Sequence, residues 1–346
     1  MLTHMLRHAG RDPSFLIGGV SLDLGQSYGL GRGPHFVVEG DEYDTAFFDK
    51  RPKFVHYLPD IAIIGNVEFD HADIYEDLAA VQLAFTRLMS VVPRRGLLVA
   101  GIESPALAAI LDRARSRVVT FGLEEASGAD LQARSIELSG GGASFDVVRR
   151  GTDLGRLTLS ASGRHNVRNA LAATAAALEA GLDFDEVARA MAVFRGVKRR
   201  LELRGEARGV RVYDDFAHHP TAVRETVAAL RSRIPAGERI VVIFEPRSYT
   251  SRTKVFEADF AAAFATADEV IVAAAHMPGK VPEGQRVSEE RLVAAIGEAG
   301  GRARLIRTVP EIVADLAPRS LAGDHLLVLS NGGFGGIHDR LLDALR

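Results

Sequence analysis

Two acidic segments carry the residue types of a metal and phosphate site. Glu39-Gly-Asp-Glu-Tyr-Asp44 and Asn66-Val-Glu-Phe-Asp-His71 each follow a short apolar run that is typical of a buried parallel strand. Ligands of open α/β sheets bind at the carboxyl ends of the strands, where carboxylates can hold a divalent cation together with an anionic substrate. The pattern therefore predicts two neighbouring strands that deliver Glu39 and Asn66 to one edge of a sheet. Surface acidity at the start of two loops is the alternative.

These segments hold more acid than one magnesium ion uses. A bound Mg²⁺ keeps several waters and takes one or two protein ligands, so most of the carboxylates are expected beside the site or on the surface. His71 is either a metal ligand or a histidine held by a backbone carbonyl. The full set is Glu39, Asp41, Glu42, Asp44, Glu68, Asp70, His71 and Asp73.

A third segment opens a predicted helix. Gly163-Arg-His-Asn-Val-Arg-Asn169 places His165, Asn166 and Asn169 on or near the first helical turn. Exposed donors there suit a nucleotide base or phosphate, although an asparagine at a helix start more often caps the helix. Without further support, the sequence favours the capping role.

Two more segments join strands to helices in the second half of the chain. Tyr213-Asp-Asp-Phe-Ala-His-His-Pro220 precedes a helix that begins near its proline. Asp214 and Asp215, at a strand end, can hold ribose hydroxyls or a substrate amine. Ser330-Asn-Gly-Gly-Phe-Gly-Gly336 is a glycine-rich turn whose amides can approach an anion, or whose glycines only permit a tight turn.

The two common nucleotide-binding loops are not found in the sequence. Gly279-Lys280 is followed by valine, and position 274 is an alanine where the phosphate-loop pattern requires a glycine. Gly29-Leu-Gly-Arg-Gly-Pro34 ends in proline where the dinucleotide fingerprint requires glycine.

Hydrophobic periodicity predicts the elements that position the first three segments. Residues 1 to 9 form a helix that stops at Gly10, and apolar runs then alternate with helices to form a mainly parallel sheet. Glycine-rich alternation between 128 and 160 predicts antiparallel strands on the flank of the same domain. The predicted strands are 15–17, 36–38, 61–64, 97–99 and 118–121, and the predicted helices are 76–92, 165–180 and 184–194.

A second βαβ series begins after residue 197. Its strands are predicted near 210–214, 239–244, 269–274, 303–307 and 325–330, with a helix between each pair. The sequence therefore predicts an α/β protein with two mainly parallel-sheet domains, at 1–197 and 198–346.

Composition excludes several classes of function. The 346 residues contain no cysteine, which excludes disulfides, thiolate metal sites and a cysteine nucleophile. The start lacks the pattern of a signal peptide and no apolar run could span a bilayer, so we expect a cytoplasmic protein. A net charge of −3, with both signs mixed along the chain, provides no drive toward nucleic acid or membranes.

Taken in order, six motifs resemble those of the Mur ligases. They are Glu39-Gly-Asp-Glu-Tyr-Asp-Thr-Ala-Phe-Phe-Asp-Lys-Arg51, Asn66-Val-Glu-Phe-Asp-His-Ala-Asp73, Gly163-Arg-His-Asn-Val-Arg-Asn169, Val197-Lys-Arg-Arg-Leu-Glu-Leu-Arg204, Tyr213-Asp-Asp-Phe-Ala-His-His-Pro220 and Ser330-Asn-Gly-Gly-Phe-Gly-Gly-Ile-His338. The resemblance implies a central ATP- and Mg²⁺-binding domain at 1–197 and a Rossmann-like C-terminal domain at 198–346. In the family, a UDP-binding domain and a phosphate loop precede the helix that begins here at Met1. We therefore expect a chain truncated at its amino terminus that does not ligate by itself.

The resemblance also implies roles for individual residues. Glu39 and His71 resemble the Mg²⁺ ligands, with Asn66 and Glu68 beside them. His165 and Asn169 would face the adenine, with Asn166 next to them in the cofactor site. Arg200 resembles the arginine that reaches the ATP phosphates, Asp215 resembles the ribose-binding aspartate, and His218 and His219 would line the cleft near the incoming peptide. Residues 71 to 95 contain no lysine, which puts the carbamylated lysine of several family members in doubt.

The implied reaction joins a peptide to a sugar nucleotide. ATP phosphorylates the lactoyl carboxylate of UDP-N-acetylmuramate, and the amine of the tripeptide L-Ala-γ-D-Glu-meso-diaminopimelate attacks the acyl phosphate, a step of peptidoglycan recycling. The segment Thr45-Ala-Phe-Phe-Asp-Lys-Arg51 favours the tripeptide over free alanine by resemblance alone. Three alternatives remain: a UDP-N-acetylmuramate–L-alanine ligase, a non-catalytic nucleotide- or peptide-binding fragment, and a metal-dependent hydrolase that uses Asp41, Asp70, His71 and Asp73.

Overall fold

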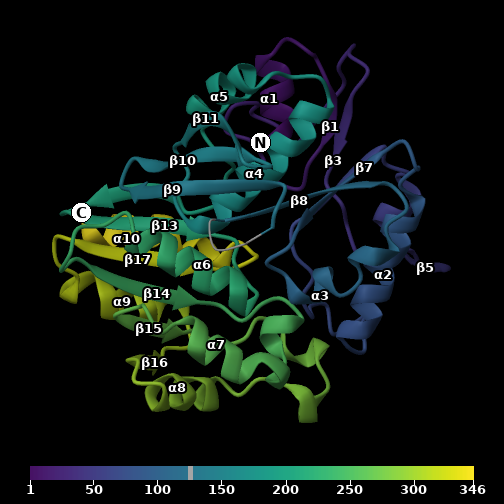
Figure 1. Ribbon diagram of the computed structural model, residues 1–346. Helices are drawn as coiled ribbons and strands as arrows, with labels where there is room; N and C mark the ends of the chain where they lie inside the picture. The colour runs from purple at the N-terminus through teal and green to yellow at the C-terminus, as the bar shows by residue number, and fades with distance from the viewer. Residues whose placement is uncertain (124–127) are drawn as a thin grey trace. The chain divides into compact units, whose positions relative to one another are not determined.

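The chain forms two compact units, Met1–Val197 and Lys198–Arg346. The computed structural model describes residues 1–123 and 128–346 (Figure 1). Among those residues, no helix has the length and apolar character needed to cross a membrane. Both units are α/β, with sheets rich in parallel strands, as the sequence predicts.

The larger sheet of the first unit has the strand order β11-β10-β9-β8-β7-β6. Its parallel part is made of β6 (Ile61–Ile64), β7 (Leu97–Gly101), β8 (Arg117–Leu123) and the start of β9 (Leu131–Ser139). β10 (Gly142–Arg149) and β11 (Thr152–Leu159) continue it in the antiparallel direction. A parallel connection needs a crossover, and α2 (Leu78–Val91), capped by Asp77, lies between β6 and β7. The predicted change from parallel to antiparallel pairing is confirmed.

The first two predicted strands lie in a different sheet. β1 (Ser14–Leu16) pairs parallel to β3 (Phe36–Val38) and antiparallel to β2 (Tyr28–Gly29), which makes a separate three-stranded sheet. The prediction of one sheet across residues 14–121 was therefore wrong. An apolar run indicates a strand, but it does not specify which neighbour that strand pairs with.

A short hairpin of β4 (Asp44–Ala46) and β5 (Asp49–Pro52) follows the small sheet. Its tip presents two phenylalanines to solvent, since Phe47 is 93% exposed and Phe48 is 91% exposed. The hairpin thus displays most of the segment Thr45-Ala-Phe-Phe-Asp-Lys-Arg51 to solvent.

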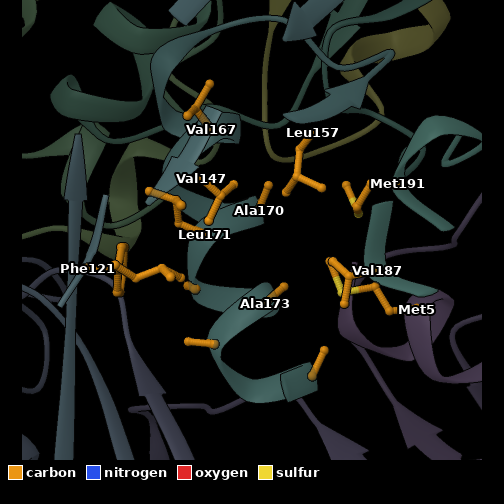
Figure 2. Close-up of a cluster of buried hydrophobic side chains, with 14 of the residues drawn as sticks. Met5, Phe121, Val147, Leu157, Val167, Ala170, Leu171, Ala173, Val187 and Met191 are labelled. Carbon is orange, nitrogen blue, oxygen red and sulfur yellow. The ribbon is translucent and has the colours of Figure 1, made fainter. Parts of the chain in front are cut away.

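An alanine-rich helix lies at the centre of the first unit's core. α4 (Arg164–Glu179) packs on β7, β8 and β9, and its small side chains allow close approach to the sheet. Figure 2 shows Ala170 and Ala173 of α4 among larger side chains contributed by the sheet and by neighbouring helices. α1 (Leu2–His8) and α5 (Phe184–Ala192) pack beside α4. These three helices agree with the prediction to within two residues at each end.

The second unit has the strand order β12-β13-β17-β14-β15-β16. The five predicted strands are present and parallel: β13 (Val210–Asp215), β14 (Arg239–Phe244), β15 (Glu269–Val272), β16 (Ala303–Leu305) and β17 (Asp324–Leu329). The edge strand β12 (Glu202–Ala207) was missed. It is antiparallel to β13, and its Glu-Leu-Arg-Gly-Glu-Ala sequence lacks the β-branched and aromatic residues that indicate a strand.

The order of these strands decides which loops meet. β17 lies between β13 and β14, so the carboxyl ends of three adjacent parallel strands place Asp215, Glu245 and Ser330 at one edge. α6 (Pro220–Arg231) follows β13, and α10 (Ile337–Leu345) follows β17. The remaining crossover helices are α7 (Glu257–Ala263), α8 (Glu289–Glu298) and α9 (Val309–Arg319).

Two glycines of the antiparallel region test how closely β10 and β11 are packed. Gly142 and Gly151 both have positive φ, of 129° and 83°. A Cβ at Gly142 would lie 2.0 Å from the carbonyl oxygen of Leu159. A Cβ at Gly151 would meet no described atom within 4 Å. We expect Gly151→Ala to lower the free energy of unfolding by about 1 kcal/mol through backbone strain. Gly142→Ala adds a steric clash of roughly 2 kcal/mol or more. Thermal unfolding followed by circular dichroism compares the variants, and equal losses would contradict this packing.

Candidate functional site

Glu39 lies directly after β3 and is held by the neighbouring strand. Its backbone N–H donates to the carbonyl oxygen of Leu16, and its Oε2 accepts a hydrogen bond from the N–H of Gly18 at 2.6 Å. A Cβ at Gly18 would lie 2.9 Å from Oε1 of Glu39, so the glycine permits this close approach. The carboxylate is therefore fixed at the carboxyl end of the β1–β3 pair.

His71 is paired with a carboxylate, and the backbone-carbonyl alternative is wrong. Its Nε2 lies 2.5 Å from Oε1 of Glu42, and its ring centroid lies 4.3 Å from that of Tyr43. Burial by itself lowers the pKa of His71, but the hydrogen bond to Glu42 and the charges of Asp70 and Asp73 outweigh burial and raise the pKa. The sequence included Glu42 in the acidic segment without a role, because no spacing rule links residues 29 positions apart.

These contacts fit a metal site with few protein ligands. In residues 1–123 and 128–346, no group of three or more His, Asp or Glu side chains is arranged to hold a metal ion. Mg²⁺ commonly takes one or two protein ligands and keeps its waters. A metal-binding histidine usually donates its other ring N–H to a carboxylate, and the pairing of His71 Nε2 with Glu42 leaves Nδ1 as the ring nitrogen that could take a metal ion.

Asn66 follows β6, which belongs to a different sheet from β3, the strand that precedes Glu39. Its Nδ2 donates to Oε1 of Glu68 at 2.7 Å, and the next residue, Val67, is buried and donates its N–H to Ser104 Oγ. The expectation that Glu39 and Asn66 end neighbouring strands of one sheet was wrong, because β3 and β6 do not pair.

The start of α4 is not capped in the predicted way. Among the described residues no side chain caps it, and Gly163 occupies the N-cap position with a φ of 99°. Asn166 lies inside the first turn, so its Nδ2 reaches back to the carbonyl oxygen of Ser162 at 2.8 Å and lies 3.0 Å from His165 Nε2. Asn169 is exposed one turn later. The helix start therefore keeps backbone N–H groups that favour an anion.

In the second unit, Asp215 holds the turn that follows β13. Its Oδ2 accepts the N–H of Leu201 at 2.6 Å, and its Oδ1 accepts the N–H of Ala217 at 2.8 Å and the hydroxyl of Thr226 at 3.3 Å. The carboxylate is 4% exposed and is fixed at the carboxyl end of the strand.

The aromatic ring of Phe216 organises the side chains around that turn. The guanidinium carbon of the exposed Arg200 lies 5.6 Å from the ring centroid, within cation–π range. His218 packs edge-on against the same ring, and its Nδ1 lies 2.9 Å from the carbonyl oxygen of Phe216. His219 is the residue before α6, and its ring packs against Phe256.

Sequence reasoning missed Arg199, Glu245 and Arg247. Arg199 donates to the carbonyl oxygens of Ser330 and Gly332 at 2.5 and 2.8 Å. Glu245 accepts a 2.5 Å hydrogen bond from the Ser330 hydroxyl. The pattern Glu245-Pro-Arg247 directly after a strand could have indicated this edge of the sheet, because ligands bind where such strands end.

The glycine-rich turn after β17 needs its glycines for two reasons. A Cβ at Gly332 would lie 2.0 Å from Nε of Arg247, so this glycine permits close approach of a side chain. Gly335 and Gly336 have φ values of 57° and 70° and form the tight turn into α10. The tight turn considered from the sequence therefore occurs at Gly335 and Gly336, and the approach of the turn's amides to an anion stays a prediction.

Asp214 is buried among cationic partners and gives a pH-dependent test. Burial by itself raises the pKa of Asp214, but His338 and Arg199 outweigh it and lower the pKa below its ordinary value of 3.8. A depressed folded pKa gives stability that is present above pH 3.8 and is lost as the pH falls through the folded pKa. We expect Asp214→Asn to lower the melting temperature at pH 7. The difference from the parent chain should shrink as the pH falls below 3.8. Asp343→Asn, at an exposed carboxylate, is the control, and a pH-independent difference would contradict the assignment.

Comparison with known proteins agrees with the resemblance seen in the sequence. The Mur ligase middle domain matches residues 34–177, and the Mur ligase glutamate ligase domain matches residues 199–332. The chain is 40% identical to UDP-N-acetylmuramate–L-alanyl-γ-D-glutamyl-meso-2,6-diaminoheptandioate ligase of Escherichia coli K12, over all of this chain and 72% of the relative. It is 37% identical to UDP-N-acetylmuramate–L-alanine ligase of Desulfosudis oleivorans, over 99% of this chain and 72% of the relative.

A solved structure extends the similarity to three dimensions. The crystal structure of a murein peptide ligase from Psychrobacter arcticus matches 99% of this chain and 74% of its own, with a TM-score of 0.71 and 34% identity. Family models, sequence relatives and this structure thus agree across both compact units. The chain belongs to the Mur ligase family.

Proposed function

We propose that this chain is an ATP-dependent ligase that joins L-Ala-γ-D-Glu-meso-diaminopimelate to UDP-N-acetylmuramate. The observation that carries the proposal is 40% identity along the whole chain to a ligase whose name states those substrates. The Mur ligases are ATP-dependent ligases. Cytoplasmic peptidoglycan recycling is the proposed setting of the reaction.

The chemistry requires activation of a carboxylate. An amine does not displace an oxygen of an ionised carboxylate in water, so the γ-phosphoryl group of ATP is first transferred to the lactoyl carboxylate. Arg200 is proposed to stabilise the phosphoryl group, because its exposed guanidinium can make paired hydrogen bonds to phosphate oxygens. Glu39 and His71 are proposed to hold Mg²⁺, which when bound offsets the charge of the phosphates.

The amine of the tripeptide must lose a proton as it attacks the acyl phosphate. The carbonyl oxygen of Phe216 can only accept, so Nδ1 of His218 donates to it and, in the neutral ring, Nε2 carries the lone pair. His218 is therefore proposed as the general base, and His219 as a second group near the peptide. The new amide bond forms as phosphate leaves with the electron pair of the acyl–oxygen bond.

The remaining residues are proposed to bind the nucleoside. His165 and Asn169 lie four positions apart on one face of α4, and Asn166 lies beside His165. They offer donors and acceptors to an adenine edge. Asp215 is proposed to accept a hydrogen bond from a ribose hydroxyl, since its carboxylate is fixed at the end of β13.

Asn66 is proposed to assist at the Mg²⁺ site together with Glu68.

The hydrolase alternative has the least support. It would leave the second unit, whose residues 199–332 match the Mur ligase glutamate ligase domain, without a task. Of the acidic residues that a hydrolase would use, Asp41 already accepts a hydrogen bond from Lys53 at 2.7 Å. The L-alanine ligase and a non-catalytic binding module remain the competing functions.

The first test measures phosphate release from ATP in the presence of UDP-N-acetylmuramate and either the tripeptide or L-alanine. Release that depends on the tripeptide would establish the proposed ligase and would contradict the expectation from the sequence that this chain does not ligate by itself. Release that depends on L-alanine would establish the alternative ligase, and release without any acceptor would establish a hydrolase. Binding of ADP and tripeptide by calorimetry, without release, would establish a binding module. A full-length E. coli relative serves as the positive control.

A second test concerns Arg200. We expect Arg200→Ala to reduce phosphoryl transfer by a factor on the order of 10²–10³, the usual effect of removing one donor to transition-state charge. Arg211→Ala removes an arginine of the same unit whose side chain pairs with Glu206 on the exposed face, and it should leave the rate unchanged. Equal rates for the two variants would remove Arg200 from the mechanism.

A further inference from the structure

The residues on both sides of Arg200 have an unusual backbone. Arg199 has a φ of 59° and Leu201 has a φ of 50°, which are left-handed conformations that side chains of this size rarely adopt. Such conformations cost free energy and persist only where the surroundings impose them. The direction in which Arg200 leaves the chain is therefore imposed by its neighbours.

Buried and half-buried carboxylates impose this conformation on the backbone. The N–H of Arg199 donates to Oε2 of Glu202 at 2.8 Å, and the N–H of Leu201 donates to Oδ2 of Asp215 at 2.6 Å. These two hydrogen bonds hold the peptide group between residues 198 and 199 and the one between residues 200 and 201. They leave the Arg200 side chain itself exposed, against the ring of Phe216.

The side chain of Arg199 connects this segment to the glycine-rich turn. Its terminal nitrogen donates to the carbonyl oxygens of Ser330 and Gly332, while its Nε lies 3.2 Å from Oδ2 of Asp214. A planar guanidinium can satisfy acceptors in several directions at once, whereas a lysine ammonium has no such fork. Arg199 thus links residues more than a hundred positions apart.

Asp214 is the centre of this arrangement. It is 2% exposed, and its Oδ1 lies 3.4 Å from Nε2 of His338, which is 6% exposed and belongs to the first turn of α10. Arg204 approaches the same carboxylate at 3.6 Å. Arg199 hydrogen-bonds to the start of the turn between β17 and α10, and His338, at the end of that turn, lies next to the same buried carboxylate. We call Asp214, Arg199 and His338 the clamp.

We propose that the clamp is a positioning device that presents Arg200 to the phosphates of the nucleotide. The proposal rests on the proposed role of Arg200, and it assigns the two adjacent arginines opposite tasks. The guanidinium of Arg199 makes its contacts inside the unit and holds the backbone in place. The side chain of Arg200 is exposed and is available to the ligand. Asp214 acts through Arg199 and touches no substrate in this assignment.

The test uses Arg199→Lys, which keeps the charge but loses the fork, and Arg211→Lys as the matched control on an exposed pair. Binding of Mg²⁺ with a non-hydrolysable ATP analogue is titrated by calorimetry. We expect Arg199→Lys to weaken binding by about tenfold, equivalent to 1.4 kcal/mol, and Arg211→Lys to leave it unchanged. In an Arg200→Ala background, Arg199→Lys should have no further effect, because its influence passes through Arg200.

Hydrogen exchange provides a measurement that does not depend on the ligand. In Arg199→Lys and in Asp214→Asn, amides of residues 198–203 and 330–336 should exchange faster, while those of β14 keep their protection. Unchanged exchange in both segments would overturn the clamp. Arg199→Lys could also weaken binding equally in the parent chain and in the Arg200→Ala variant. That result would overturn the clamp, because Arg199 would then contact the nucleotide directly.

The calorimetric titration and the hydrogen-exchange measurement together separate failure of the clamp from failure of the proposed function. If the unmodified chain does not bind the nucleotide analogue, the proposed function fails, and the role of Arg200 fails with it. The exchange measurement then still decides whether Asp214 and Arg199 hold the two segments together.

Discussion

Hydrogen bonding between parallel strands decides which distant residues of this chain meet. β17 pairs with β13 on one side and with β14 on the other, which brings together residues that are more than a hundred positions apart in sequence. Because all three strands point the same way, Asp215, Glu245 and Ser330 emerge at the same edge. The turn contacts, the clamp and the exposed Arg200 all lie at this edge. None of them could be assembled if β17 lay at the outside of the sheet.

At the same edge, adjacent charged residues have different partners. Asp214 and Asp215 are adjacent in sequence, yet their carboxylates serve different partners, one among cations and the other among backbone N–H groups and a hydroxyl. Adjacent residues of a strand face opposite sides of the sheet, so this division follows from strand geometry. The two arginines at 199 and 200 are divided in a comparable way, although there the cause is a strained turn.

Much of the fold was predictable, because β14, β15 and β17 contain continuous apolar runs and α2 begins at an aspartate cap. Pairing was less predictable. The strand at 36–38 was identified correctly but was assigned to the wrong sheet, and β12 was missed because an exposed edge strand needs few apolar residues. In the candidate site, sequence motifs singled out Arg200 and Asp215 as predictions but gave no indication of the contacts of Arg199 or Glu42. Those contacts depend on long-range packing, which leaves no local pattern in the sequence.

The strained segment around Arg200 also has a place in the order of folding. Arg199 reaches acceptors that are 131 and 133 positions away, so these bonds can form only after β17 has paired with β13. Closing so long a loop is entropically unfavourable until the sheet that rewards it exists. The contacts of the Arg199 side chain with the glycine-rich turn therefore form late, when β17 is in place. A nascent or partly folded chain would carry the complete arginine motif and yet lack the geometry that makes it useful.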